Sequence, residues 1–240
     1  MASKSKSDIV YFGLKQSIID CSLTPSSKIK INDVCERFDV SLGAAREALS
    51  RLAAEGMVTM EAQKGFSVAS ISWGDFKQIM DARVEIETYC LKHSIQNGDM
   101  DWEVQVAASH HRLARLSAKR DPSHLFPNPA WIDAHAEFHR ALVAACPNKC
   151  MLELREMLYA RSERYRHWAV VLSLSVGQRN DVQEHEELAR LSLDRDDPGA
   201  CAAMRPHFSK TTDILLEAAR NYYEEGRKDD PEYSWLAASG

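Results

Sequence analysis

Four histidines are the residues of this 240-residue chain with the clearest capacity for chemistry. His135 and His139 lie four residues apart in the segment HAEFHR, so on a helix both imidazoles point to the same side. That side also carries the apolar residues Ile132, Leu142 and Cys146. A lone inward histidine is usually a core residue, but an HxxxH pair plus one histidine from each of two later helices favours a metal site. The predicted metal ligands are His135, His139, His185 and His207.

Three arginines on apolar helix faces are the next candidates. Arg83 and Glu87 are spaced as an i, i+4 pair on the stripe of Phe76, Met80, Cys90 and Leu91, which predicts a buried ion pair. Arg161 and Arg164 interrupt a second predicted stripe, formed by Leu154, Met157, Trp168 and Leu172. An inward guanidinium could bind a small carboxylate in bidentate fashion, or it could form a salt bridge between helices or between subunits. Both readings stay open, and the candidate effector-binding residues are Arg83, Arg161 and Arg164.

Six amphipathic helices are expected to position these side chains. Ser72 with Asp75 resembles a capping box at the start of the first helix, and Asn128 with Pro129 is typical of the start of the third. The expected helices span residues 72–96, 101–119, 128–146, 149–175, 181–193 and 198–225. Their short connections predict an antiparallel bundle over residues 71–228, and residues 229–240 are expected to form a flexible tail.

The first 70 residues have a different pattern. Helices are expected over 8–20 and 31–40, and a third helix begins after the N-cap Ser41. Its apolar face carries Ala45, Ala48, Leu49 and Leu52, and its polar face carries Gly43, Arg46, Glu47 and Ser50. Alternating residues on either side of 63–65 then predict a β-hairpin. This order is typical of a winged helix-turn-helix, whose third helix enters the DNA major groove; the alternative is a packing module without a ligand.

Charge and composition limit the classes of protein. Residues 1–70 carry nine Lys and Arg against eight Asp and Glu, whereas residues 71–240 carry 21 against 27. These charges exclude a uniformly basic nucleic-acid-binding protein. They do not exclude a small, near-neutral DNA-binding domain joined to an acidic domain. Six cysteines without a CxxC pair argue against a disulfide framework or a zinc ribbon. With no apolar signal core and no run long enough for a membrane span, a cytoplasmic protein is expected.

The DNA-binding segment carries a family resemblance. AAREALSRLAAEGMVTMEAQKGFSVA resembles the GntR superfamily of bacterial regulators, whose usual pattern is VSRTPVREALRRLEAEGLV followed by a wing glycine. The matching residues are Arg46, Glu47, Ala48, Leu49, Leu52, Glu55, Gly56 and Gly65. Leu42, Gly43 and Ala44 replace the family's Arg-Thr-Pro, which shifts more of the DNA contact to Arg46 and the wing residue Lys64. The predicted DNA-binding residues are Ser41, Gly43, Arg46, Ser50, Lys64 and Gly65.

The helical part resembles the FCD-type effector domain of the FadR subfamily, so the resemblance covers about residues 8–225. Relatives with a metal site place Asp-x-x-x-His on the equivalent helix and one histidine on each of the last two helices. His135 takes the Asp position here, and the loss of a negative ligand favours Zn²⁺ or Ni²⁺ over harder ions. The resemblance implies a homodimer that binds a double-stranded DNA operator under the control of a small carboxylate.

A second function class is a metal-dependent hydrolase with an accessory DNA-binding module. The segment HAEFH differs from the HExxH of zinc proteases, because Glu137 lies one position too late. The sequence places no other general base beside the histidines. The regulator is therefore the favoured prediction.

Overall fold

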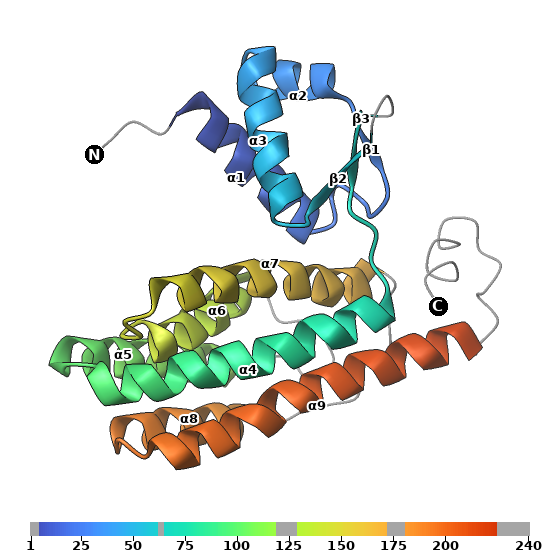
Figure 1. Cartoon of the computed structure of the whole chain (residues 1–240). Coiled ribbons are helices and arrows are strands. Elements are labelled where there is room, and N and C mark those ends of the chain that lie inside the picture. The colour runs from blue at the N-terminus through green and yellow to red at the C-terminus, as the bar shows by residue number, and fades with distance from the viewer. Residues whose placement is uncertain (1–4, 62–64, 119–128, 172–180, 225–240) are drawn as a thin grey trace. The chain divides into compact units, whose positions relative to one another are not determined.

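The computed structural model describes residues 5–61, 65–118, 129–171 and 181–224, shown as ribbons in Figure 1. These residues are mainly helical, with one small antiparallel sheet, and confirm the predicted fold class. The chain divides into two compact units. The described residues of the first unit fall within Met1–Phe76, Tyr159–Ser173 and Tyr222–Gly240, and those of the second fall within Lys77–Leu158 and Leu174–Asn221. The predicted tail 229–240 lies outside the described residues.

Three helices form the core of the first unit. They are α1 (Lys6–Ile19), α2 (Ile31–Phe38) and α3 (Leu42–Ala54). Ser41 is the N-cap of α3, as predicted, and its hydroxyl accepts from the Ala44 N–H at 3.4 Å. The apolar face of α3 packs against α1 and α2, and its four predicted core residues are fully buried: Ala45, Ala48, Leu49 and Leu52. The polar face of α3 is therefore left at the surface.

A glycine ends α3 and turns the chain into the wing. Gly56 has a φ of +71°, a left-handed conformation that costs glycine little because it has no Cβ. The Met57 N–H donates to the Leu52 carbonyl at 2.9 Å across this turn. The left-handed backbone at this position therefore explains why the family-like pattern has a glycine there.

The wing is a hairpin extended by a third strand. Strands β2 (Val58–Glu61) and β3 (Gly65–Val68) pair antiparallel, which confirms the predicted hairpin. The tip, residues 62–64, lies outside the described residues. Strand β1 (Lys28–Ile29) pairs with the other edge of β3, giving the order β1-β3-β2. Sequence alone did not predict β1, because two residues carry no periodicity and their pairing depends on distant β3.

Six helices follow the wing among the described residues, as predicted. They are α4 (Trp73–Asn97), α5 (Met100–Ser117), α6 (Pro129–Val143), α7 (Lys149–Val171), α8 (Val182–Leu193) and α9 (Asp197–Glu224). The Ser72 hydroxyl accepts from the Asp75 N–H at 3.0 Å, so the predicted cap of α4 is present. Helix α5 begins earlier than expected, because Asp99 caps it through the Trp102 N–H. The predicted cap Asn128 lies outside the described residues.

Helix α5 packs against α6 and α8 in the second unit, and polar contacts join α4 to α9. Figure 1 shows α4 and α9 running beside each other along most of their length. All six cysteines are free thiols, as expected without a disulfide framework. Among the described residues, no helix combines the length and apolar character that a bilayer crossing requires.

Candidate metal centre and DNA-reading helix

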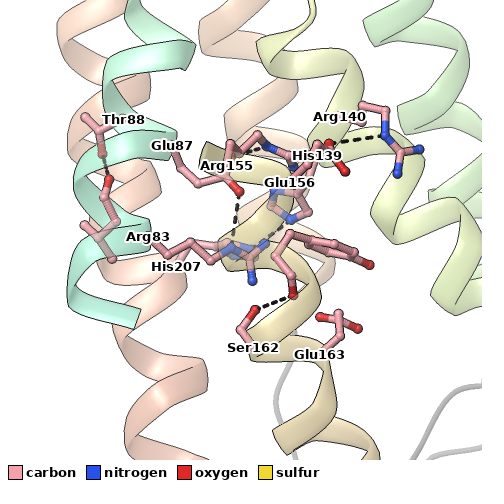
Figure 2. Close-up of polar contacts among 12 residues, drawn as sticks. Arg83, Glu87, Thr88, His139, Arg140, Arg155, Glu156, Ser162, Glu163 and His207 are labelled. Atoms are coloured by element: carbon pink, nitrogen blue, oxygen red, sulfur yellow. Dashed lines mark hydrogen bonds and ion pairs between the residues drawn. The ribbon is translucent and has the colours of Figure 1, made fainter. Parts of the chain in front are cut away.

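The four predicted histidines come together inside the second unit. His135 and His139 lie on α6, His185 lies on α8 and His207 lies on α9, and all four side chains are buried. Their candidate ligand nitrogens all lie within 4.8 Å of one another. Figure 2 shows His139 and His207 meeting between their helices. The HxxxH spacing therefore placed both α6 histidines correctly on the inward face.

Aromatic packing orients the first of these rings. Trp131 lies one turn before His135 on α6, and the two rings are stacked, 4.8 Å between centroids and 17° between planes. The Trp131 Nε1–H donates to Ser117 Oγ on α5 at 2.8 Å, so the indole is itself fixed. Stacking on a fixed indole limits the rotation of the His135 imidazole.

A carboxylate on α8 orients the last ring. His207 Nδ1 lies 2.8 Å from Glu184 Oε2, so that nitrogen donates its hydrogen to the carboxylate. The opposite nitrogen, Nε2, then faces the cluster and lies 3.2 Å from His139 Nε2. Lys210 donates to the other carboxylate oxygen of Glu184 at 3.0 Å. Sequence reasoning missed Glu184, because its partner is on another helix 23 residues away.

The donor set fits a divalent transition ion. Metal binding needs neutral imidazoles, and burial, then His135, His207, His185 and Arg83, lowers the pKa of His139 well below its usual value. Nδ1 of His139 is buried without a hydrogen-bond partner among the described residues. Two imidazole nitrogens bound at about 2.1 Å to one ion lie about 3.0 Å apart at a right angle in an octahedral site and about 3.4 Å apart in a tetrahedral one. The 3.2 Å between the two Nε2 atoms lies between these values. The cluster could therefore hold a divalent metal ion.

A buried ionic triad involves Arg83. Its Nε donates to Glu87 Oε1 at 3.2 Å, and Arg155 Nε on α7 donates to Glu87 Oε2 at 2.9 Å (Figure 2). The predicted Arg83–Glu87 pair is thus confirmed as buried. The Arg83 guanidinium also lies over the Phe208 ring at 4.6 Å. Burial disfavours the charge of Arg155, but Glu87 and Glu156 outweigh it and raise the pKa of that arginine.

The predicted inward stripe of α7 does not include Arg155, because it is displaced by one residue from the stripe that is buried. The predicted stripe is right at Trp168, which is buried, but wrong at Leu154, which is 38% exposed. Leu172 lies outside the described residues. The buried positions run instead through residues spaced three to four apart: Arg155, Leu158, Ser162 and Tyr165. Counting this second stripe in the sequence would have identified Arg155.

The other two candidate arginines lie in the first unit and contact the segment that follows the wing. Arg161 Nη2 donates to Asp75 Oδ1 at 3.3 Å, and Arg164 Nη2 donates to the Ala69 carbonyl at 2.5 Å. Tyr165 donates to the second oxygen of Asp75 at 2.9 Å. Burial lowers the pKa of Arg164. These contacts bind α7 to residues 69–75 rather than to the histidine cluster.

The predicted DNA-binding residues lie at the surface of the first unit where the structure describes them. Those on α3 and at its cap are exposed, as is the wing glycine: Ser41, Gly43, Arg46, Ser50 and Gly65. Lys64 lies outside the described residues. Arg51 donates to Asp8 at 2.8 Å and lies 4.1 Å above the Tyr11 ring, so it makes contacts within its own domain. Arg46 therefore remains as an exposed cation near the start of α3.

Two family models match the chain. "Bacterial regulatory proteins, gntR family" matches residues 6–68, and "FCD domain" matches residues 78–210. The HTH-type transcriptional regulator BphR of Paraburkholderia xenovorans LB400 is 34% identical over 206 residues, 85% of this chain and 82% of BphR. The HTH-type transcriptional repressor GlaR of Escherichia coli K12 is 34% identical over 210 residues, 87% of this chain and 94% of GlaR.

Solved structures share the fold. E. coli McbR/YncC superimposes with a TM-score of 0.73 at 17% identity, covering 90% of this chain and 99% of that one. A GntR transcriptional regulator from Rhodococcus sp. RHA1 gives 0.68 at 19% identity, with the same coverage. These findings support a regulator and give no support to the hydrolase alternative. Because both models match and both relatives align over most of their length, the chain belongs to the GntR family of bacterial DNA-binding transcriptional regulators, with the FCD effector-binding domain of its FadR-like members.

Proposed function

We propose that the protein is a homodimeric cytoplasmic regulator whose affinity for its operator is controlled by a small carboxylate bound at a metal centre in the bundle. One observation carries the proposal: four inward imidazoles and the buried guanidinium of Arg83 lie in the same compact unit. The DNA-reading face of α3 lies in the other unit. Binding of a small molecule and reading of DNA are thus assigned to different residues.

The DNA-binding role is assigned to the exposed face of α3. Arg46 lies within the first turns of the helix, where side chains of a recognition helix approach base edges. Gly43 permits close approach of the backbone, and Ser41 and Ser50 have hydroxyls suited to phosphate oxygens. One such helix reads only a few base pairs, so a two-fold dimer on a pseudo-palindromic site is the expected arrangement. Lys64 and Gly65 at the wing would contact the backbone beside it.

The effector role is assigned to the histidine cluster and Arg83. His135, His139, His185 and His207 would hold the ion and leave one or two of its coordination positions open, so that the bound ion would supply a Lewis-acid site for a carboxylate oxygen. Four neutral donors leave the full charge of a divalent ion in the site, so an anionic ligand is favoured. Arg83 has a planar guanidinium of the kind that binds carboxylates, and its Nε donates to Glu87 Oε1.

The contacts of Arg161 and Arg164 favour a different role. Both guanidiniums bind groups of residues 69–75, which directly follow β3. We assign them to the connection between the wing and α4, and Arg83 to the effector. The relative GlaR is named a repressor, which supports repression as the role of this protein too. We assign release to the carboxylate: the dimer would bind its operator without the effector and dissociate when the carboxylate binds.

The test is an operator-binding titration. Metal-loaded protein first selects a duplex from a random pool, and fluorescence anisotropy then measures its affinity for that duplex with mono- and dicarboxylates. Sugars and amines serve as controls. At least one carboxylate should weaken binding tenfold or more, and the same compound at 100 times its dissociation constant should add about 2.7 kcal/mol to stability. A protein that selects no duplex, or whose affinity no carboxylate changes, would contradict the proposal.

A further inference from the structure

Glu184 lies directly behind one of the four histidines. Its Oε2 accepts from His207 Nδ1 at 2.8 Å, on the side of the ring opposite to His139. We infer that Glu184 is a positioning residue of the metal centre, which fixes the tautomer and ring orientation of His207 and strengthens it as a ligand. This inference rests on the proposed metal site and adds to it a residue outside the ligand set.

The tautomer is the first part of the argument. A carboxylate can only accept a hydrogen bond, so the hydrogen of the neutral His207 ring is kept on Nδ1. The lone pair is then on Nε2, the nitrogen that faces His139 at 3.2 Å. Without Glu184, the hydrogen could move to Nε2, where it would have to be lost before a metal could bind. Glu184 therefore prepares His207 before the ion arrives.

Charge is the second part of the argument. The ligand set is made of four neutral imidazoles, so the cluster itself offers no negative charge to a divalent ion. Glu184 supplies one charge at the far side of a ligand ring, in the carboxylate–histidine arrangement that increases ligand basicity. This outer carboxylate therefore lowers the net positive charge of a loaded site by one.

The geometry of α8 explains how one helix supplies both a ligand, His185, and the carboxylate behind another ligand, Glu184. Consecutive residues on an α-helix point about 100° apart, so neighbours reach different partners. His185 points into the cluster from α8, while Glu184 is partly exposed and reaches the back of His207 on α9. Lys210, one turn after His207, is 57% exposed and binds the other oxygen of Glu184. Lys210 and His207 therefore share the Glu184 carboxylate, one at each oxygen.

The competing explanation is a structural one, in which Glu184 only ties α8 to α9. The two explanations differ in what a substitution changes. A tie would lower the stability of the metal-free protein and leave metal affinity unchanged. A positioning residue would lower metal affinity more than it lowers the stability of the metal-free protein.

The experiment measures Zn²⁺ affinity by competition with a chromophoric chelator in the full-length protein. Glu184→Ala removes the acceptor and the charge, and Glu184→Gln keeps the shape and removes only the charge. Glu187→Gln, an exposed carboxylate three residues further along the same helix, is the matched control. We expect affinity to fall 10- to 100-fold in Glu184→Ala, by a smaller factor in Glu184→Gln, and not in Glu187→Gln. The Co²⁺ absorption spectrum should shift in Glu184→Ala, because the His207 ring is no longer fixed.

The outcomes separate the two proposals. A wild-type protein that binds no Zn²⁺ would overturn the metal centre and the role of Glu184 with it. A wild-type protein that binds Zn²⁺ with the same affinity as Glu184→Ala would overturn the role of Glu184 alone. Equal loss in Glu184→Gln and Glu187→Gln would reduce the effect to general surface charge, which also contradicts the inference.

Discussion

His139 Nε2 and His207 Nε2 lie 3.2 Å apart, although 68 residues separate the two histidines in the chain. Both rings are buried, and Glu184 accepts a hydrogen bond from the Nδ1–H of His207. Two facing ring nitrogens are favourable when they share a hydrogen or an ion. This one relationship connects the packing of α6 and α9 to the chemistry proposed for the site.

The first prediction concerns pH. The pKa of His139 in the folded protein is lowered well below its usual value, chiefly by burial, whereas in the unfolded chain it is about 6.5. Below about pH 6.5 the unfolded chain therefore binds a proton that the folded chain does not. The free energy of unfolding of the metal-free protein should decrease as pH falls through this range. Urea denaturation with a chelator present, at several pH values, measures it.

The control for this prediction removes the titrating group. His139→Phe should show a shallower dependence of unfolding free energy on pH than the wild type, because one proton no longer differs between the two states. Identical slopes in the two proteins would show that His139 titrates normally and would contradict the prediction.

The second prediction concerns the buried triad. Glu87→Ala removes the carboxylate that Arg83 and Arg155 share, and breaking a buried ion pair on one side typically costs about 3–5 kcal/mol. Asp81→Ala breaks the exposed Lys77–Asp81 pair of the same helix and should cost about 0.5 kcal/mol or less. Urea denaturation compares the two variants, and similar small losses in both would mean that the triad contributes little.

The third prediction concerns DNA reading. Arg46→Ala should weaken binding to the selected duplex by about 1–3 kcal/mol, with a smaller effect on unrelated sequences. Lys64→Ala should weaken binding to all sequences more evenly. It should also reduce the slope of log affinity against log salt concentration by about one. Arg190→Ala changes the net charge equally but alters an exposed pair on α8, and should leave DNA binding unchanged. Normal binding by Arg46→Ala would refute the proposed docking of α3.

The fourth prediction separates the arginines. Arg83→Ala should retain operator binding and lose the response to the carboxylate. Arg83→Lys should not restore that response, because an ammonium lacks the bidentate fork. Arg164→Ala should keep effector binding and lower the melting temperature, because it removes a buried donor to Ala69. The melting temperature with and without the carboxylate measures both effects. If only Arg164→Ala lost the increase in melting temperature that the carboxylate causes, Arg164 would bind the effector and Arg83 would have the structural role.

Local periodicity explains which features were predictable. The burial of Ala45, Ala48, Leu49 and Leu52 follows from spacing along one helix, and so does the shared face of His135 and His139. Each needs only the 3.6-residue repeat and one apolar face. The order of helices and hairpin was predictable for the same reason, since each element carries its own pattern.

The missed features depend on packing between elements. Glu184 acquires its role only because α8 lies against α9, and β1 exists only because β3 offers a free edge. Arg155 was missed for a different reason. Two possible apolar stripes on α7 are displaced by one residue, and the stripe that is buried contains a charged side chain, so it does not look apolar in the sequence. A sequence pattern predicts the apolar face only where a single stripe stands out, and it does not say which distant polar group meets that face.

The most direct measurement of the central claim is the metal content of the protein purified without an affinity tag, dialysed and reloaded. Inductively coupled plasma mass spectrometry should find about one divalent transition ion per protomer, Zn²⁺ or Ni²⁺ foremost. His139→Ala and His185→Ala should lose most of it while still binding the selected duplex. Clearly sub-stoichiometric metal in the wild type, or equal metal in the wild type and both variants, would contradict a metal centre built from these histidines.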